Sequence, residues 1–361
     1  MSFTVEDLIM FAREQKASDI HLTVGAPTVF RINGKLERLE DIEDEVVSRT
    51  ILSMLSAEQE KALRAGQDLD FSMETSDGSR QRVNVFRQMG KIAASIRLLN
   101  SKVPSFGELG LPTKLMSDLC TLQKGLVLVT GATGSGKSTT MAAMVNHINK
   151  TRPVHILTIE DPVEYKYAPS VATIHQREIG ADVDTFDGAL RSALREDPDV
   201  ILVGEMRDYE TISLAITAAE TGHLVIASLH TTNAPQTIDR IIDVFPTNSQ
   251  GQVRSQLSML LKAVISQILV PTRDGKGRVA ALEILLGNDA VSNMIRTEKG
   301  HQLPSLMQNS KSGMCLMNDS LRKLFQLGKI SRADALEYSP NRPNLEEMIG
   351  GVAAASSGMD M

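Results

Sequence analysis

The sequence predicts an α/β protein in two parts, an α+β module at the N-terminus and a larger α/β domain with a parallel sheet. The first observation is that apolar runs alternate with helix-compatible stretches from residue 126 to residue 285, which is typical of a parallel sheet covered by helices. The second is that residues 19–99 contain short strand-like pieces joined by tight turns, as antiparallel strands do. The third is a glycine-rich segment at 131–138, between an apolar run and a helix-compatible stretch.

The composition is that of an ordinary globular protein. The chain has 361 residues, of which 42% are hydrophobic and 23% are charged, and this length predicts two domains. The net charge is −6 and there is no basic tail, so no nucleic-acid partner is expected. Cys120 and Cys315 are the only cysteines, which argues against a disulfide framework and against a structural zinc site.

The sequence contains no pattern that targets a chain to or through a membrane. The N-terminus lacks a basic segment followed by an apolar segment, and the apolar runs are far shorter than the roughly 20 residues of a membrane span. We therefore expect a cytoplasmic protein with no direct membrane insertion, which reaches a membrane only through a partner.

In the N-terminal module, a helix is expected over 4–16, where Thr4 and Asp7 fit a capping box. Strand-like pieces follow within 19–38, with Asn33 and Gly34 as a hairpin turn. A second helix is expected over 46–65. The remaining strands of the module are expected over 68–73, 80–88 and 92–99.

The larger domain begins after a linker at 100–112 that is rich in Pro and Gly. Its strands are expected over 126–130, 154–160, 200–203, 224–229 and 279–285, and helices over 290–296, 301–308 and 319–326. The last stretch is rich in Pro, Ser, Gly and Met and is expected to be disordered. The predicted parts are an N-terminal domain (1–99), a linker (100–112), a core (113–286), a C-terminal helical region (287–338) and a disordered tail (339–361).

The glycine-rich segment fits the pattern G-x-x-x-x-G-K-[ST] at every fixed position. Glycines let backbone N–H groups turn toward phosphate oxygens, and the N-terminus of the following helix adds partial positive charge. In this pattern the lysine reaches the β- and γ-phosphates, and the serine offers its hydroxyl to Mg²⁺. A nucleoside triphosphate is therefore expected to bind at Gly131, Ala132, Thr133, Gly134, Ser135, Gly136, Lys137, Ser138 and Thr139.

Acidic residues follow two of the expected strands, at 158–164 and at 197–208. A nucleotide hydrolase needs an acid on the side of the metal ion and a group that orients the attacking water. The strand at 200–203 ends in Gly204 and Glu205, where a typical Walker B strand has a metal-supporting Asp. The first cluster is therefore expected to supply the acids near the metal, Glu160 and Asp161. Solvated strand ends are the alternative, but two clusters beside a phosphate loop favour a site.

Two histidines, His223 and His230, bracket the apolar strand at 224–229. A histidine in such a place is more often a structural hydrogen-bonding group than a catalyst. A neutral imidazole near phosphates can also sense their presence, but the spacing does not decide between these roles.

Positive charge is concentrated in the strands between residues 80 and 97. The default interpretation is a charged surface. The alternative is an arginine that stabilises transition-state charge on a triphosphate held by another domain or subunit. The residues are Arg80, Arg82, Arg87, Lys91 and Arg97.

Taken together, these segments resemble the secretion ATPase superfamily that powers type II secretion and type IV pili. The resemblance covers residues 2–338 and is carried by the segments 17–22, 131–138, 158–164, 194–208 and 221–233. The run from Gly204 to Asp208 is specific to that family, so the glycine in place of the usual Asp is what the resemblance implies.

The resemblance implies a PAS-like α+β domain followed by a RecA-like P-loop ATPase core and a helical C-terminal region, assembled as a homohexamer. It implies ATP and Mg²⁺ as ligands. By resemblance, Glu205 is the catalytic glutamate, Glu164 lies near the metal and the water, and His230 belongs to the segment that couples the nucleotide to the subunit interface. Arg82 and Arg97 match arginines that the N-terminal domain brings to the nucleotide.

Within this family the chain resembles the branch that retracts type IV pili during twitching motility. It lacks the extra N-terminal domain and the tetracysteine insert that are usual in assembly and secretion ATPases. Residues 290–296 match the C-terminal helix of the retraction branch in part, since Val291 and Ser292 depart from it. The implied partner is an inner-membrane pilus platform protein, which recruits the motor to the inner face of the cytoplasmic membrane.

Several other functions stay open at this point. They are an accessory retraction paralogue, a pilus assembly or type II secretion ATPase, a RecA-like nucleic-acid motor and a non-hydrolysing nucleotide-dependent scaffold. The low aromatic content of 4% argues against the nucleic-acid motor, because such a channel stacks bases on aromatic side chains.

Overall fold

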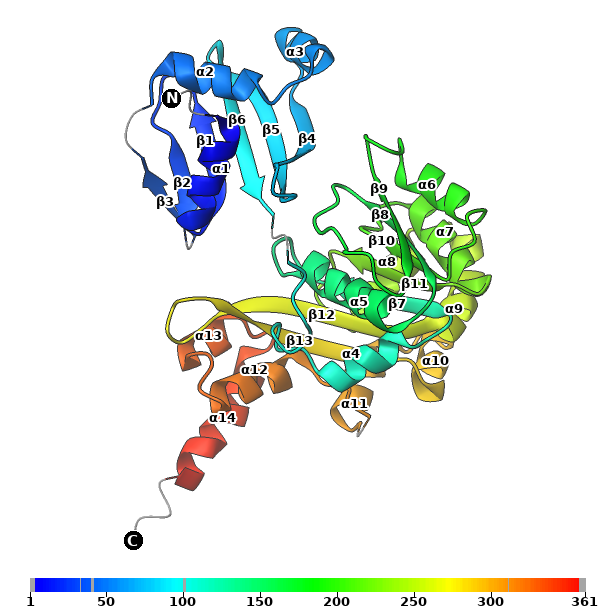
Figure 1. Cartoon of the computed structure of the whole chain (residues 1–361). Coiled ribbons are helices and arrows are strands. Elements are labelled where there is room, and N and C mark those ends of the chain that lie inside the picture. The colour runs from blue at the N-terminus through cyan, green and yellow to red at the C-terminus, as the bar shows by residue number, and fades with distance from the viewer. Residues whose placement is uncertain (1–3, 33, 40–41, 100–101, 311, 357–361) are drawn as a thin grey trace. The chain divides into compact units, whose positions relative to one another are not determined.

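The computed structural model describes residues 4–32, 34–39, 42–99, 102–310 and 312–356. The chain divides into two compact units (Figure 1). The first unit consists of Met1–Lys102 together with the short segment Pro162–Lys166, and the second consists of Val103–Asp161 and Tyr167–Met361.

The first unit is a six-stranded antiparallel sheet with three helices, as the α+β prediction required. The helices are α1 (Val5–Glu14), α2 (Asp44–Leu52) and α3 (Ala57–Arg64). The strands, in their order across the sheet, are β3 (Lys35–Arg38), β2 (Val29–Ile32), β1 (Ala17–Thr23), β6 (Lys91–Leu98), β5 (Arg80–Gln88) and β4 (Leu69–Glu74).

One face of this sheet carries the core of the first unit. Ile20, Ile96 and Val83 are cross-strand partners on three neighbouring strands, and all three are fully buried. They pack with Leu8 of α1 and Ile51 of α2. Because side chains alternate along a strand, the residue before or after each of these points to the opposite face of the sheet.

Two of the helices in the first unit, α1 and α3, start at a capping box. The capping box between Thr4 and Asp7 is present, which confirms the predicted start of α1. The single helix predicted over 46–65 is wrong, because Ser56 forms its own capping box with Gln59 and starts a separate helix, α3. The predicted turn at Asn33 lies outside the described residues.

The second unit contains a seven-stranded sheet in which six strands run parallel. The parallel sheet was predicted, but β13 is antiparallel to β12. A turn of six residues, 272–277, joins these two strands and leaves no room for a crossover helix. In order, the strands are β13 (Arg278–Leu286), β12 (Leu261–Pro271), β7 (Gly125–Thr130), β11 (Leu224–Leu229), β10 (Val200–Val203), β8 (His155–Glu160) and β9 (Thr173–Glu178).

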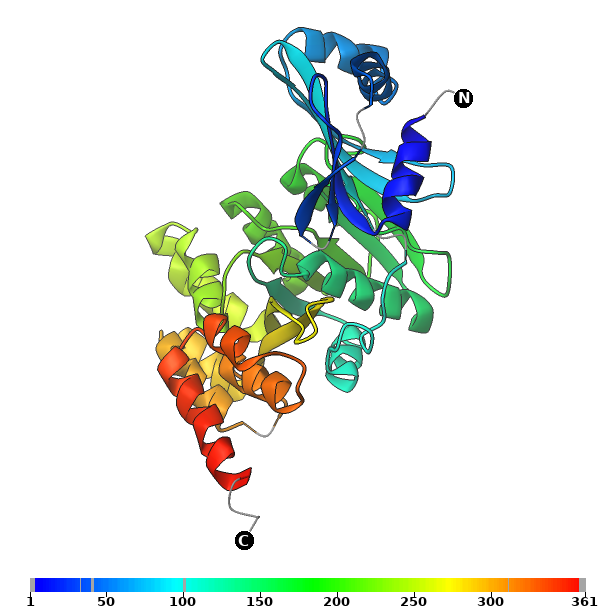
Figure 2. The same ribbon diagram turned by 90° about the vertical axis from the view of Figure 1, so that its left-hand side faces the viewer.

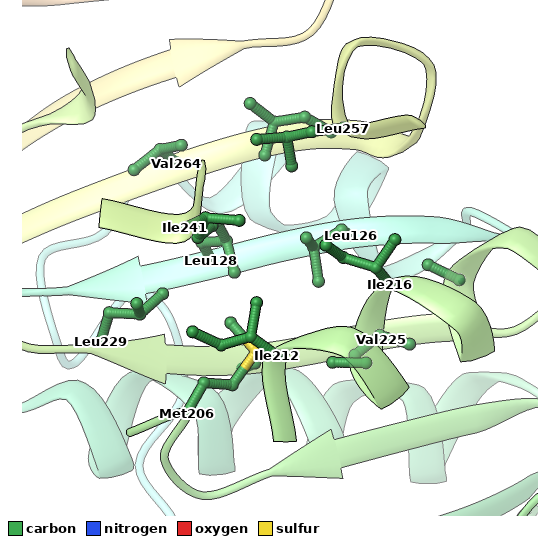
Figure 3. Packing of buried hydrophobic residues seen from close by; sticks show 14 of the residues in the cluster. Leu126, Leu128, Met206, Ile212, Ile216, Val225, Leu229, Ile241, Leu257 and Val264 are labelled. Atoms are coloured by element: carbon green, nitrogen blue, oxygen red, sulfur yellow. The ribbon is translucent and has the colours of Figure 1, made fainter. Parts of the chain in front are cut away.

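Helices cover both faces of this sheet, and β7 is buried on both. Leu126 and Leu128 belong to one hydrophobic cluster with Ile212 of α7 (Figure 3), whereas Val127 and Val129 belong to another. The second cluster includes α4 (Thr113–Cys120) and α5 (Lys137–Thr151). The first includes α6 (Phe186–Ala193), α7 (Tyr209–Glu220), α8 (Ala234–Asp243), α9 (Thr247–Leu260) and α10 (Asp289–Arg296).

The C-terminal region is helical up to residue 356 (Figure 2, orange to red). The predicted disorder of 339–361 is therefore wrong for α14 (Arg342–Ser356), where Leu345 and Ile349 are buried against α12 and α13. Their spacing of four places them on one helix face. Residues 357–361 lie outside the described part of the chain. The other helices are the 3₁₀ turn η1 (Gly300–Gln302), α11 (Leu303–Gln308), α12 (Met317–Gln326) and α13 (Arg332–Glu337).

Among the described residues, no helix combines the length and the apolar character that crossing a bilayer requires.

Replacing Leu345 tests the packing of α14. Leu345→Ala removes a side chain that is 0% exposed, so it should lower the free energy of unfolding by about 2–5 kcal/mol. Leu327→Ala, at a side chain that is 61% exposed, is the control and should change it by less than about 0.5 kcal/mol. Urea denaturation measures both. Equal effects of the two substitutions would show that α14 is not docked.

Candidate functional site

The glycine-rich segment forms a tight loop between β7 and α5. Gly131 has φ +143° and Gly136 has φ +89°, both in the region that favours glycine. A Cβ at Gly131 would lie 2.4 Å from the Gln267 carbonyl oxygen and 2.6 Å from Ser135 Oγ. No residue other than glycine fits at 131 without a shift of the backbone. The loop therefore lies closely against β12, the strand that contains Gln267.

The loop offers donors at the start of a helix. Gly136 is the N-cap of α5, and no side chain within the described residues caps this helix. The buried hydroxyl of Ser135 also lacks a hydrogen-bond partner among the described residues. Lys137 Nζ donates to the carbonyl oxygens of Gly131 (2.8 Å) and Ala132 (3.1 Å). These features fit phosphate oxygens, which would accept from the first-turn N–H groups, the hydroxyl and the ammonium.

Gln267 holds the loop from β12, and the sequence interpretation missed it. It is 2% exposed, its Nε2 donates to the Ser135 carbonyl oxygen at 2.6 Å, and its Oε1 accepts from Thr140 Oγ1 at 2.9 Å. Next to it, Ser266 Oγ lies 2.8 Å from Thr130 Oγ1. Two adjacent polar residues inside an apolar run were the signal that such a role exists.

Gly204 brings β10 close to its neighbour β8. Its N–H donates to the Ile159 carbonyl oxygen at 2.8 Å, and its carbonyl accepts from Ser228 Oγ at 2.6 Å. A Cβ at this position would lie 3.2 Å from the Ile159 oxygen and 3.3 Å from the Glu160 Cα, which is tighter than ordinary contact. An Asp side chain would therefore be crowded here, and Glu205 is the first residue after β10 that can present a carboxylate.

Glu205 lies among positive groups. Arg207 Nη2 is 2.7 Å from its Oε2, and His230 Nε2 is 2.8 Å from its Oε1. Partial burial raises the pKa of the Glu205 carboxyl, but the hydrogen bond from Arg207 and the charges of His230, Arg207 and Lys137 outweigh burial and lower the pKa below its ordinary value. Glu205 is therefore anionic at neutral pH. The structure brings Lys137, Glu205 and His230 together at one edge of the sheet.

The predicted metal-side acids lie at the end of β8. Glu160 Oε1 accepts from Thr158 Oγ1 at 2.7 Å, Asp161 is exposed, and Ser138 is half-buried in the first turn of α5. Within the described residues, no three or more His, Cys, Asp or Glu side chains are grouped to hold a metal ion. A hydroxyl and one or two carboxylates are ligands that Mg²⁺ accepts, because water and phosphate usually complete its shell.

The acidic segment at 158–164 is divided between the two units. Glu160 and Asp161 belong to the second unit, whereas Glu164 lies in the segment Pro162–Lys166 that packs with the first. There Lys166 forms an ion pair with Glu74 of β4. The structure therefore does not place Glu164 in the same unit as the other two acids.

The predicted arginines form a row on the first unit's sheet. Arg82 and Arg97 are cross-strand partners on β5 and β6, and Arg97 is also the partner of Asp19 on β1. Arg97 Nε donates to Asp19 Oδ1 at 3.0 Å, and Arg82 Nε donates to Asp70 Oδ1 at 3.1 Å. The sheet thus gathers charges far apart in the sequence on the face opposite the core.

A cavity of about 250 Å³ adjoins the loop. Gly136, Thr139 and Thr140 line it on the loop side. Part of the predicted linker also lines it, with residues 107–111. The other lining residues are Gln267 and Leu269 of β12, Arg278, Val279 and Ala280 of β13, and Lys329 in the turn after α12. This cavity is the hollow that adjoins the phosphate loop on its β12 side. The sequence interpretation assigned no function to most of these residues.

A mainly parallel sheet whose interior strand β7 leads through this loop into α5 defines a P-loop nucleotide-binding protein. The family described as type II/IV secretion system protein matches residues 2–333. The chain belongs to this family, which confirms the predicted superfamily.

Individual relatives match nearly the whole chain. The type IV pilus retractation ATPase PilT of Pseudomonas aeruginosa is 47% identical over 338 residues, which are 92% of this chain and 97% of that protein. The type IV pilus ATPase PilU of the same organism is 38% identical over 347 residues, or 95% and 91% of the two chains. A crystal structure of the pilus retraction motor PilT with bound ADP has a TM-score of 0.89 and 47% identity, and the match covers 96% and 100% of the two chains.

Replacing Gln267 tests whether it holds the loop. Gln267→Met keeps the volume but leaves the Ser135 carbonyl and the Thr140 hydroxyl unpaired in a buried place, at a cost of about 1–3 kcal/mol. We expect nucleotide affinity to fall at least tenfold in a titration with a fluorescent nucleotide. Gln256→Met, which removes an exposed hydrogen bond to Glu220 on α7, is the control and should bind normally. Unchanged affinity in Gln267→Met would contradict the role.

Proposed function

We propose that this chain is an ATPase motor that drives the retraction of type IV pili. The observation that carries the proposal is the near full-length similarity to PilT, at 47% identity, in a chain that contains a phosphate loop and the acidic residue Glu205. The identity to the type IV pilus ATPase PilU is lower, at 38%.

In this proposal the triphosphate lies against the loop and α5. The N–H groups at the start of α5 and the Lys137 ammonium meet the phosphate oxygens, and the loop carbonyls that now accept from Lys137 Nζ keep the ammonium at the loop. Ser138 would be the hydroxyl ligand of Mg²⁺, and Glu160 and Asp161 would supply the acids near it. When bound, Mg²⁺ neutralises charge that develops on the phosphates.

Glu205 is the residue that orients the attacking water. Its lowered pKa keeps it anionic, so it accepts a hydrogen bond from water at neutral pH. Arg207 and His230 hold the two carboxylate oxygens, and His230 is the first residue after β11. A change of charge at the phosphates therefore acts on His230 through Glu205. We also propose that Glu164 is the second acid near the water.

Arg97 and Arg82 are proposed to meet transition-state charge across a domain or subunit boundary. Their present partners are the carboxylates of Asp19 and Asp70. A phosphate is an acceptor of the same kind, so each arginine can exchange one anion for the other without loss of hydrogen bonds.

The working assembly is proposed to be a homohexameric ring in the cytoplasm. An inner-membrane pilus platform protein recruits it to the inner face of the cytoplasmic membrane. The support is the resemblance to the family, together with similarity to PilT along nearly the whole chain.

Two substitutions separate binding from hydrolysis. Glu205→Gln keeps the shape but removes the charge that orients the water, so kcat should fall on the order of 10²-fold or more while nucleotide binding stays close to normal. Lys137→Ala removes the ammonium from the phosphates and should lower both binding and turnover. A phosphate-release assay and a nucleotide titration measure the two quantities. Normal turnover in Glu205→Gln would refute its assigned role.

A deletion strain tests the direction of the motor. If the protein retracts pili, cells that lack it should carry abundant surface pili and should not twitch, as electron microscopy and a stab assay would show. A plasmid copy of the wild-type gene should restore twitching, and a Glu205→Gln copy should not. Deletion cells without any pili would point to an assembly motor instead.

A further inference from the structure

Ser228 is a buried polar residue in β11 to which the proposed reaction assigns no role. It is 2% exposed, in a strand whose residues are all buried. Because side chains alternate along a strand, Ser228 shares a face of the sheet with Leu224 and Ile226, which belong to a hydrophobic cluster. A hydroxyl in such a place destabilises the fold unless it is hydrogen-bonded. The hydrogen-bond partners of Ser228 therefore define its role.

Two hydrogen bonds of Ser228 enclose Glu205. The Ser228 hydroxyl donates to the Gly204 carbonyl oxygen at 2.6 Å, and the Ser228 carbonyl oxygen accepts from the Met206 N–H at 3.0 Å. Gly204 and Met206 are the two chain neighbours of Glu205. One residue of β11 thus holds the backbone on both sides of the acid.

Each neighbour of Glu205 has a further attachment. The Gly204 N–H donates to the Ile159 carbonyl oxygen at 2.8 Å. The Met206 side chain is 4% exposed and lies in one hydrophobic cluster with Ile212 and Leu229 (Figure 3). Gly204 is thus held between β8 and β11, and Met206 between β11 and the cluster. The bonds to Ser228 are what these two attachments have in common.

The same end of β11 reaches the phosphate loop. β11 pairs in parallel with β7, and the Leu229 carbonyl oxygen accepts from the Gly131 N–H at 3.3 Å. His230 Nε2 lies 2.8 Å from Glu205 Oε1. Three consecutive residues, 228–230, therefore contact the first residue of the loop, both neighbours of the acid and its carboxylate.

We propose that Ser228 is a positioning residue for Glu205: its hydroxyl and its carbonyl group fix the backbone on both sides of the acid and so set the distance from the acid to the phosphate loop. The inference rests on the proposed function, in which Glu205 orients the attacking water. A displacement of about 1 Å at such a group lowers a rate on the order of 10²-fold. Loss of one of the two bonds is therefore measurable as turnover.

Ser228→Ala removes the hydroxyl and keeps the carbonyl group that holds Met206. The Gly204 carbonyl loses this donor, so Glu205 shifts relative to the loop. We expect kcat for ATP hydrolysis to fall about tenfold, because the water is oriented less well. The KM for ATP and the affinity for Mg·ADP should change less than about twofold, because the substitution leaves the phosphate loop intact. A phosphate-release assay and a titration with a fluorescent nucleotide, both on the full chain, measure these quantities.

The pH profile of kcat supplies a readout that a mere loss of stability does not move. Its acid limb reports the protonation of Glu205 in the nucleotide complex. In the wild type, the hydrogen bond from Arg207 and the charges of His230, Arg207 and Lys137 outweigh burial and lower the pKa of this carboxyl. A carboxylate that moves away from these groups has a higher pKa and is protonated at higher pH. The acid limb of Ser228→Ala should therefore shift toward neutral pH by about 0.5 unit or more.

Ser258→Ala is the matched control. Ser258 lies in α9, is also 2% exposed, and its hydroxyl donates to the Ser255 carbonyl oxygen at 2.7 Å. The two substitutions remove the same group from equally buried places, so Ser258→Ala should keep both kcat and the pH profile. If Ser228→Ala does not fold, as judged from its melting temperature, Ser228→Cys replaces it. A thiol is a weak donor, so the same direction of change is expected.

Each outcome decides a different statement. A lower kcat with a shifted acid limb in the Ser228 variant, and neither in Ser258→Ala, supports the positioning role. A normal kcat in the Ser228 variant, while Glu205→Gln is inactive, overturns the positioning role and leaves the proposed function standing. A fall in kcat without a shift of the limb, or an equal fall in Ser258→Ala, also overturns the positioning role. Normal turnover in Glu205→Gln overturns the role of Glu205 in the proposed function and the positioning role with it.

Discussion

The position of β7 between β11 and β12 is the constraint on which the nucleotide site depends. Parallel pairing on both sides aligns the carboxyl ends of these strands, so Thr130 stands level with Ser266 on one side and Leu229 on the other. From this edge the chain passes into the loop, and the neighbouring strands supply Gln267 and His230. A slip of one residue in either register would turn those side chains to the other face of the sheet.

The carboxyl edge of the sheet also explains why the acid comes one residue later, at Glu205, and not at Gly204. Gly204 accommodates close approach to the backbone of Ile159 and Glu160, and Glu205 then lies where Arg207 and His230 reach it. The lowered pKa of this carboxyl is a product of that crowding of positive groups. The close packing of the β10 backbone against β8 therefore also determines which charged groups surround Glu205.

Local patterns predicted most of the elements. The start of α1 and four of the parallel strands follow from short-range chemistry, namely a capping box and apolar runs. The errors have a common cause in long-range packing. Strand β9 has mostly polar side chains and exists because β8 pairs with it, and α14 is ordered because α12 and α13 bury its apolar face. Such contacts leave little trace in composition.

The sequence by itself determined the phosphate loop, because its glycines, Lys137 and Ser138 are contiguous and their chemistry depends only on neighbours a few residues away. It also placed an acid, Glu205, just after the apolar strand at 200–203, whereas the catalytic role of this acid is what the family resemblance implies. Only the tertiary structure decided which distant residues meet this segment. Gln267 reaches the loop from 132 residues away in the sequence, and Glu283 reaches the start of α8 from 49 residues away. Sheet order and register make these contacts, and no local pattern encodes either one.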